Sequence, residues 1–327
     1  MSLLALRVVT FAAALVIVTY PGEIALRAAR GQGPAGQSTR AEKTSKVPAE
    51  LNELWVEPEP NRDLFYGVGG RALMPQPMTR FTVIGVKKGG FSDGYTLRDP
   101  RGSEWSAKLY PEARTEVVAS RILWGLGYHQ PPIYTMEQWW ADGAKGDNPQ
   151  PVARFREKAP AFHGLTEDED WSYSDNPFVG SQPLDGLLVL QVMLTNADLK
   201  PAQNMRYTLT EKVEGARRWY VARDLGQSFG RTGLLSALRD DIDAYDRSKF
   251  ILGVDEGLVQ FEYYGPHVGL MKSITPADVR WMAGRLSRLT DQQWLDAFRA
   301  GGYADSTAQR FIRRMKMKIA EGLAIEG

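Results

Sequence analysis

The sequence of 327 residues contains no cysteine and only three histidines. The absence of cysteine excludes disulfide frameworks, cysteine zinc sites, iron–sulfur clusters and a thiol nucleophile. With His129, His163 and His267 as the only histidines, a multi-histidine metal site is not expected either. The chain also lacks net charge, since 40 Lys and Arg oppose 39 Asp and Glu to leave +1. We therefore expect no nucleic-acid partner, because no global field attracts a polyanion.

What the chain does contain is the composition of a globular protein, with 43% hydrophobic and 10% aromatic residues. Disordered chains lack this much apolar surface. The length allows one large two-lobed domain or two ordinary domains. We find no internal repeat of about 20–50 residues, which argues against a solenoid.

The one long apolar run lies at the N-terminus, from Val8 to Tyr20. It has 13 residues, the length of a signal-peptide core and short of the roughly 20 that span a membrane. If Leu3–Leu6 also enters the bilayer while Arg7 reaches its surface, the run becomes long enough for an anchor. We expect residues 1–30 to be a signal peptide or membrane anchor, with membrane association through residues 1–20. Export to the periplasmic side is favoured, and a cytoplasmic face or a buried core helix stays open.

Residues 31–60 are rich in Gly, Pro, Ser and charge, and they lack an apolar face of useful length. Such a stretch predicts a disordered tether. Residues 61–160 predict an antiparallel sheet with one helix, and residues 161–327 predict a mainly helical part. The expected fold class is therefore α+β with two lobes.

The first half alternates apolar and polar residues in segments that are separated by turn residues, as β-strands do. We expect five strands and one helix: strands at Phe81–Lys88, Tyr95–Asp99, Glu104–Tyr110, Ile133–Trp140 and Pro151–Lys158, and a helix at Glu112–Leu126.

The second half begins with a near-continuous apolar helix from Leu184 to Asn196. A hairpin of Met205–Thr210 and Arg218–Arg223 follows, and after Gly230 the chain is expected to be mainly helical. Thr275 and Thr290 each precede residues that favour a helix start.

Four polar elements follow one another through these segments. They are Lys108 on the third strand, Glu116 in the next helix, the stretch Asp198–Asn204 after the buried helix, and Asp224 in Asp-Leu-Gly after the hairpin. Phosphoryl transfer needs a cation on the phosphates, an anion that holds this cation, a carboxylate that receives the hydroxyl proton, and oxygen ligands for Mg²⁺. All four kinds of group are present in this order, so the sequence predicts a site for phosphoryl transfer with Mg²⁺.

The hairpin makes a geometric prediction. Asn204 and Asp224 are equally far from Glu214 at the loop centre, so a simple antiparallel register places them opposite each other. Opposed residues lie close enough for both to hold a Mg²⁺ ion.

On these residues the chain resembles the protein-kinase-like superfamily, and it is most similar to atypical bacterial members such as the HipA-type and CotH-type kinases. Its leader is similar to that of secretory-pathway kinases. The resemblance spans about residues 80–325 and implies a two-lobed kinase-like fold. It implies that Lys108 contacts ATP phosphates, that Glu116 pairs with Lys108, that Asp198 is the base and that Lys200 steadies the transferred phosphoryl group.

The resemblance further implies that Asp224 and Asn204 bind Mg²⁺. Gln203 stands at the position where the family has its metal-binding Asn. The phosphate-cradling loop corresponds to the segment of Gly89, Gly90 and Gly94. The acceptor would be a hydroxyl group of a protein or a small molecule.

Other interpretations stay open at this point. The chain could be a catalytically inactive pseudokinase, or a membrane-tethered binding or scaffold protein whose aromatic segments at Trp139–Trp140 and Phe261–Tyr264 contact a partner. The acidic run Glu167–Asp170 is expected to be a solvated loop rather than a metal site. The basic residues of the last helix, Gln309–Leu323, are expected to form a solvated face rather than a membrane or nucleic-acid surface.

Overall fold

The computed structural model describes residues 49–233 and 238–326, and all of them belong to one compact unit. The predicted leader, most of the predicted tether and the predicted membrane association lie outside the described residues. Within the described part of the chain, no helix is both long enough and apolar enough to cross a membrane.

The first half folds into a sheet followed by a helix, as expected. Strands β1 (Arg80–Lys87), β2 (Gly94–Arg98) and β3 (Glu104–Leu109) form an antiparallel meander. Asp99 stabilises the turn between β2 and β3, because its carboxylate accepts hydrogen bonds from the backbone N–H groups of Arg101 and Ser103, both at 2.9 Å. Only three residues separate the end of β3 from the start of helix α1 (Ala113–Gly125).

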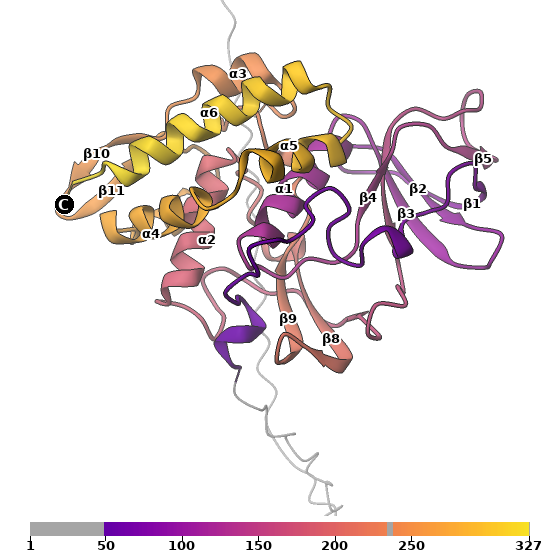
Figure 1. Ribbon diagram of the computed structural model, residues 1–327, viewed down its shortest axis with the longest axis horizontal. Helices are drawn as coiled ribbons and strands as arrows, with labels where there is room; N and C mark the ends of the chain where they lie inside the picture. Colours follow the sequence, from indigo (N-terminus) through magenta and orange to yellow (C-terminus); the bar gives the residue numbers. More distant parts are fainter. Residues whose placement is uncertain (1–48, 234–237, 327) are drawn as a thin grey trace, which may run out of the picture. The chain divides into compact units, whose positions relative to one another are not determined.

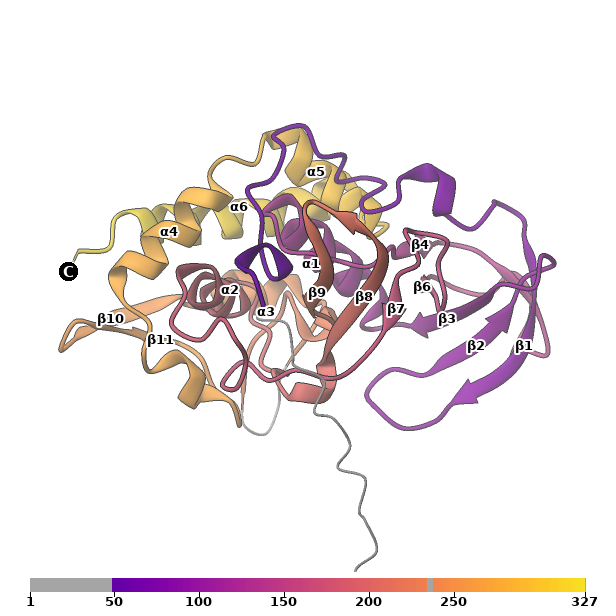
Figure 2. The same ribbon diagram turned by 90° about the horizontal axis from the view of Figure 1, so that it is seen from below.

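The sheet has six strands and not the expected five, in the order β4-β6-β3-β2-β1-β5. The segment predicted as one strand at Ile133–Trp140 divides into β4 (Tyr134–Met136) and the start of β5 (Trp140–Asp142), and β6 is Ala153–Glu157. β4 and β5 occupy opposite edges although a short link joins them. Four residue steps span at most about 15 Å, whereas the edge strands of a flat six-stranded sheet lie about 24 Å apart. The sheet must therefore curl, as Figure 2 shows.

The second half opens with helix α2 (Gln182–Met193), whose N-terminus is capped by the Ser181 hydroxyl. This helix is buried on nearly all sides, which agrees with its continuous apolar sequence. The second half also contains a three-stranded sheet of β7 (Thr166–Glu167), β8 (Asn204–Val213) and β9 (Ala216–Ala222).

The predicted pairing of Asn204 with Asp224 is wrong. Asn204 pairs with Ala222, because the register shifts between Thr208 and Val213 before the turn. The partner of Asn204 therefore lies two residues before the predicted one, because the irregularity in the ladder changes which residues face each other.

The rest of the chain is helical except for one hairpin that the sequence analysis missed. Its strands are β10 (Ile251–Asp255) and β11 (Leu258–Phe261), and several of their side chains are exposed. Thr275 and Thr290 both form complete capping boxes, as their sequence context predicts. The helices here are α3 (Ile242–Arg247), α4 (Pro276–Leu286), α5 (Asp291–Ala300) and α6 (Asp305–Leu323), and short 3₁₀ helices lie at Leu51–Glu53, Arg71–Leu73, Pro201–Gln203, Leu225–Gln227 and Val268–Met271.

Helix α1 joins the two halves of the fold. It packs against β4 and β6 on one side and against α5 on the other, and Figure 1 shows it between the sheet and the helices. Its buried residues Val118, Ile122 and Leu123 belong to the main core together with α2 and the C-terminal helices. The predicted α+β architecture, a sheet with one helix followed by a mainly helical part, is thus confirmed, and its element order is the one that the kinase-like resemblance implies.

The last residues of the predicted tether are packed against this body. Leu54 is fully buried in the main core, and Glu53 forms an ion pair with Arg218 of β9 at 2.8 Å. The indole of Trp55 donates a hydrogen bond to the carbonyl of Leu126 at 2.7 Å. The sequence analysis missed these three anchoring residues, because the proline and charge content of residues 49–60 is typical of a disordered segment.

The basic residues of α6 are not simply a solvated face. Lys318 is fully buried, and its ammonium group donates a hydrogen bond to the carbonyl of Met193 at 3.0 Å. It also lies 4.2 Å from the ring centre of Tyr245. Burial lowers the pKa of Lys318 far below its ordinary value.

We expect Lys318→Met to raise the free energy of unfolding at neutral pH by about 1 kcal/mol, because it replaces a buried ionisable group with an apolar side chain of similar volume. A lysine whose pKa is lowered in the folded state binds fewer protons there than in the unfolded chain, so stability rises with pH. Urea unfolding should show that the extra free energy of unfolding of the variant shrinks as the pH approaches the pKa of free lysine. Lys316→Met, at an exposed position of the same helix, is the matched control, and a loss of stability in Lys318→Met would contradict this account.

Candidate functional site

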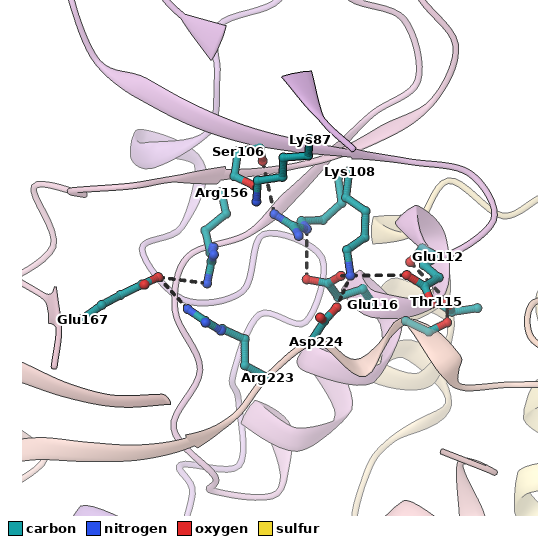
Figure 3. A network of polar contacts seen from close by, with 12 residues as sticks. Lys87, Ser106, Lys108, Glu112, Thr115, Glu116, Arg156, Glu167, Arg223 and Asp224 are labelled. Carbon is teal, nitrogen blue, oxygen red and sulfur yellow. Dashed lines mark hydrogen bonds and ion pairs between the residues drawn. The ribbon is translucent and has the colours of Figure 1, made fainter. Parts of the chain in front are cut away.

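Lys108 lies at the centre of a cluster of carboxylates. Its ammonium group is 2.7 Å from Glu116 of α1 and 3.5 Å from Glu112, the residue just before α1. It also forms an ion pair with Asp224, which follows β9 (Figure 3). Burial opposes the charge on Lys108, but Glu116 and Asp224 outweigh burial and raise its pKa. The structure thus brings together three of the residues that the sequence analysis selected.

Glu116 holds two cations at once. Lys108 on β3 pairs directly with Arg154 on β6, so two like charges stand side by side on the sheet. One oxygen of Glu116 lies 2.7 Å from Lys108 and the other lies 2.9 Å from Arg154. Burial alone would raise the pKa of Glu116, but Arg154 and Lys108 together lower it from 4.5 to about 2. Glu116 is therefore ionised and fixes the position of Lys108.

Asp224 is placed by a close contact between its segment and α1. It adopts a left-handed conformation with φ of 56° at the end of β9. Two residues later, a Cβ on Gly226 would lie 2.5 Å from Cβ of Glu112, so only glycine permits this approach. The hydroxyl of Thr115 donates a hydrogen bond to the carbonyl of Gly226 at 2.8 Å. Asp224 is thereby held beside the helix that carries Glu116.

Asp198, Lys200 and Gln203 lie on the loop that follows α2. The ammonium group of Lys200 is 3.2 Å from one oxygen of Asp198, and the amide of Gln203 donates a hydrogen bond to the other oxygen at 2.6 Å. The side chain of Asn196 accepts a hydrogen bond from the backbone N–H of Asp198 at 3.2 Å. Buried Leu199 anchors the loop in the main core. The carboxylate of Asp198 therefore has a fixed position but stays one-third exposed.

These two groups of residues face one cavity of about 390 Å³. The loop between β1 and β2 contributes Gly89, Gly90 and Gly94 to its wall. Gly89 and Gly90 have φ of 102° and 107°, a conformation that side chains rarely adopt, so glycine is required there by the backbone. The sequence-predicted residues that line the cavity are Lys108, Asp198, Lys200, Gln203, Asp224, Gly89, Gly90 and Gly94.

Asn204 is not brought to this cavity. Its side chain is buried, and its amide donates a hydrogen bond to the carbonyl of Trp171 at 3.1 Å. Gln203, the last residue of the 3₁₀ helix that precedes β8, faces the cavity instead. The predicted position of Asn204 beside Asp224 as a second Mg²⁺ ligand is therefore wrong, because the register of β8 and β9 pairs Asn204 with Ala222.

The sequence analysis missed several charged residues of the cavity wall. Arg154 could have been found from its strand, since β6 is the neighbour of β3. Arg239 has no such signal: it reaches the cavity from the segment before α3, forms an ion pair with Glu112 and lies 3.4 Å from the ring centre of Phe91. Lys87 donates a hydrogen bond to Ser106 at 3.1 Å, and burial together with the repulsion of Arg154 lowers the pKa of Lys87.

The acidic run Glu167–Asp170 is exposed to solvent, as expected, but three of its carboxylates form ion pairs. Glu167 lies between Arg156 of β6, at 3.2 Å, and Arg223 at the end of β9, at 2.5 Å (Figure 3). Asp168 and Glu169 both form ion pairs with Arg206. The pair of Glu167 with Arg156 links the three-stranded sheet to the six-stranded sheet.

The donor atoms of the cavity suit Mg²⁺ better than a transition metal. In the part of the chain that the structure describes, no group of three or more His, Asp or Glu side chains could hold a metal alone. Asp224 and Gln203 nevertheless offer hard oxygen atoms to the cavity. Mg²⁺ in phosphoryl-transfer sites is commonly held by one or two carboxylates together with substrate phosphates and water, and this donor set fits that pattern.

No protein-family model and no curated protein matches this chain. Among solved structures it is similar to the crystal structure of a Helicobacter pylori proinflammatory kinase, CtkA, with a TM-score of 0.46 and 10% sequence identity. The similarity covers 75% of this chain and 95% of that one. A likeness this distant carries no functional argument, and the chemistry of the site rests on its own contacts.

Proposed function

We propose that this protein is a phosphotransferase that moves the terminal phosphoryl group of ATP to a hydroxyl group of a protein or a small molecule. One observation carries the proposal: Lys108, held by Glu116 and Asp224, faces the same cavity as Asp198 and Lys200. Packing alone does not account for this set, because even paired charges are costly to remove from water and apolar residues would stabilise the fold as well.

Each residue has a role that its position supports. Lys108 would bind the donor phosphates, since Glu116 keeps its charge and orientation. The carboxylate of Asp198 would accept the proton of the hydroxyl while the hydroxyl oxygen bonds to phosphorus and the bond to the leaving phosphate oxygen breaks. Lys200, 3.2 Å from Asp198, would stabilise the negative charge of the transferred group.

Asp224 and Gln203 would hold Mg²⁺, which would neutralise charge on the donor phosphates when bound. Asp224 is ion-paired with Lys108 in the present arrangement. A donor phosphate on Lys108 would take over that contact and leave the carboxylate of Asp224 for the ion. The backbone N–H groups of the loop at Gly89 and Gly90 would lie over the phosphates.

A second function, nucleotide binding without catalysis, is favoured by two observations. The side chain of Asn204 is committed to Trp171, so Gln203 alone accompanies Asp224. In addition, Arg239 connects the loop residue Phe91 with Glu112 across the cavity wall. A chain in this state could bind a nucleotide while transferring no phosphate.

We expect Asp224→Asn to weaken binding of ATP at least about tenfold in the presence of Mg²⁺, because it removes the only carboxylate proposed to hold the ion. A ligand at 100 times its dissociation constant stabilises a protein by about 2.7 kcal/mol. The wild-type chain should therefore melt at a higher temperature with millimolar ATP and Mg²⁺ than with ATP and a chelator. Asp255→Asn, on the exposed strand β10, serves as control. An equal Mg²⁺-dependent shift in Asp224→Asn would show that the metal assignment is wrong.

A further inference from the structure

A second cavity lies away from the candidate active site. It has a volume of about 380 Å³ and lies between the segment 65–78, strand β4 and the end of α5. Its wall is mostly apolar and includes Tyr66, Met74, Met136 and Trp140. None of its lining residues belongs to the wall of the candidate active site.

One side chain in this wall is unusual, because Arg121 of α1 is almost completely buried, with an exposed fraction of 2%. Its Nη2 donates a hydrogen bond to the carbonyl of Ile133 at 2.7 Å, and its Nε reaches the carbonyl of Phe65 at 3.4 Å. The third nitrogen, Nη1, makes no hydrogen bond to any described residue. No carboxylate among the described residues forms an ion pair with Arg121.

The surroundings of Arg121 confirm that the protein does not neutralise this charge. The backbone of Gly67 covers Nη1 on one side, since a Cβ there would lie 2.2 Å from it. The ring of Tyr134 lies 5.7 Å away, but its hydroxyl already donates to backbone carbonyl groups. Asp63 acts on Arg121 only from a distance, and burial lowers the pKa of Arg121 to about 10. Arg121 is therefore still protonated at neutral pH.

Among the charged residues of the cavity wall, Arg121 is the cation that is available to bind an anion. Arg299 is bound to Asp305 at 2.6 Å. Glu137 is exposed and disfavours a ligand with several negative charges. A single buried guanidinium with one nitrogen free to donate suits a monoanion, and a carboxylate oxygen can accept a charge-assisted hydrogen bond from that nitrogen.

We propose that this cavity binds a small amphiphilic carboxylic acid, with its carboxylate on Arg121 and its apolar part against Met74, Met136 and Trp140. The volume lies in the range of small-molecule sites, which are mostly apolar with a few placed polar groups. The proposal does not depend on the proposed phosphotransferase activity, because the two sites share no residue.

Calorimetric titration of the full-length protein tests whether the cavity binds a carboxylic acid. The probes are decanoate and 4-phenylbutyrate, used below the concentrations at which they aggregate, with decylamine as a probe of equal chain length and opposite charge. At least one acid should bind at least tenfold more tightly than decylamine. Binding of neither acid, or equal binding of decylamine, would overturn the proposal.

Two variants locate the site. Arg121→Met should lower the affinity for the acid at least tenfold, whereas Arg101→Met, at an exposed arginine, should leave it unchanged. If Arg121→Met does not fold, Met74→Glu tests the location instead. This variant adds a second carboxylate to the half-buried wall, and its negative charge should weaken binding of the acid. Met317→Glu, at an exposed methionine of α6, is its control. Unchanged binding in the folded Arg121→Met or in Met74→Glu would show that the acid binds elsewhere.

Discussion

Asp198→Asn is expected to lower the rate of Mg²⁺-dependent phosphoryl transfer from ATP by at least about a hundredfold, the usual contribution of a general base. Asparagine keeps the shape of the side chain and cannot accept the proton. We expect little change in melting temperature, because Asp198 is one-third exposed and its contacts with Lys200 and Gln203 lie at the surface of the cavity. Affinity for ATP should change by less than about threefold.

Asp255→Asn, which lies far along the chain on exposed β10, should keep the full rate. The rates are measured as phosphate released from ATP or transferred to the protein, since water and the chain's own hydroxyl groups are acceptors in every assay. A rate in Asp198→Asn equal to that of the wild type would remove Asp198 from the role of base, whatever the acceptor.

Glu116→Gln is expected to lower the free energy of unfolding by about 3 kcal/mol, the scale for removing one partner of a buried ion pair. The variant leaves Lys108 and Arg154 opposed on neighbouring strands without the carboxylate that separates them. Glu104→Gln, also on β3 but half-exposed and paired at the surface, should cost less than about 1 kcal/mol. Chemical unfolding of both variants at neutral pH makes the comparison.

The same variant gives a pH signature. The pKa of Glu116 is lowered from 4.5 to about 2 in the folded protein, so the folded state binds fewer protons than the unfolded chain between these values. The stabilisation by Glu116 is therefore complete above pH 4.5 and is lost as pH falls toward 2. The difference in stability between wild type and Glu116→Gln should shrink from pH 6 to pH 3. A constant difference would mean that Glu116 is not the ionised partner of Lys108.

The sequence predicted those parts of the site that depend on local order. Lys108 and Glu116 meet because the strand passes directly into the helix, and a spacing of eight residues leaves little freedom. Asp198, Lys200 and Gln203 share one short loop, so their proximity follows from their positions in the chain. The capping boxes at Thr275 and Thr290 are local for the same reason.

The errors arose where the geometry is set by more distant parts of the chain. Asn204 was placed opposite Asp224 by symmetry, and a bulge beyond Thr208 shifted the register. Arg239 reaches the cavity wall through contacts with Glu112 and Phe91 that no periodicity indicates. The curl of the sheet, which brings β5 beside β1, depends on the pairing of all six strands.

The most direct test of the central proposal is phosphate transfer from γ-labelled ATP by the full-length chain, with Mg²⁺ or with a chelator, alongside Lys108→Met. The account predicts label in inorganic phosphate or on the protein with Mg²⁺, at least about a hundredfold less with Lys108→Met, and none with the chelator. Mg²⁺-dependent binding of ATP without any transfer would favour the nucleotide-binding function instead. Absence of both binding and transfer would contradict the assignment of this cavity as a phosphoryl-transfer site.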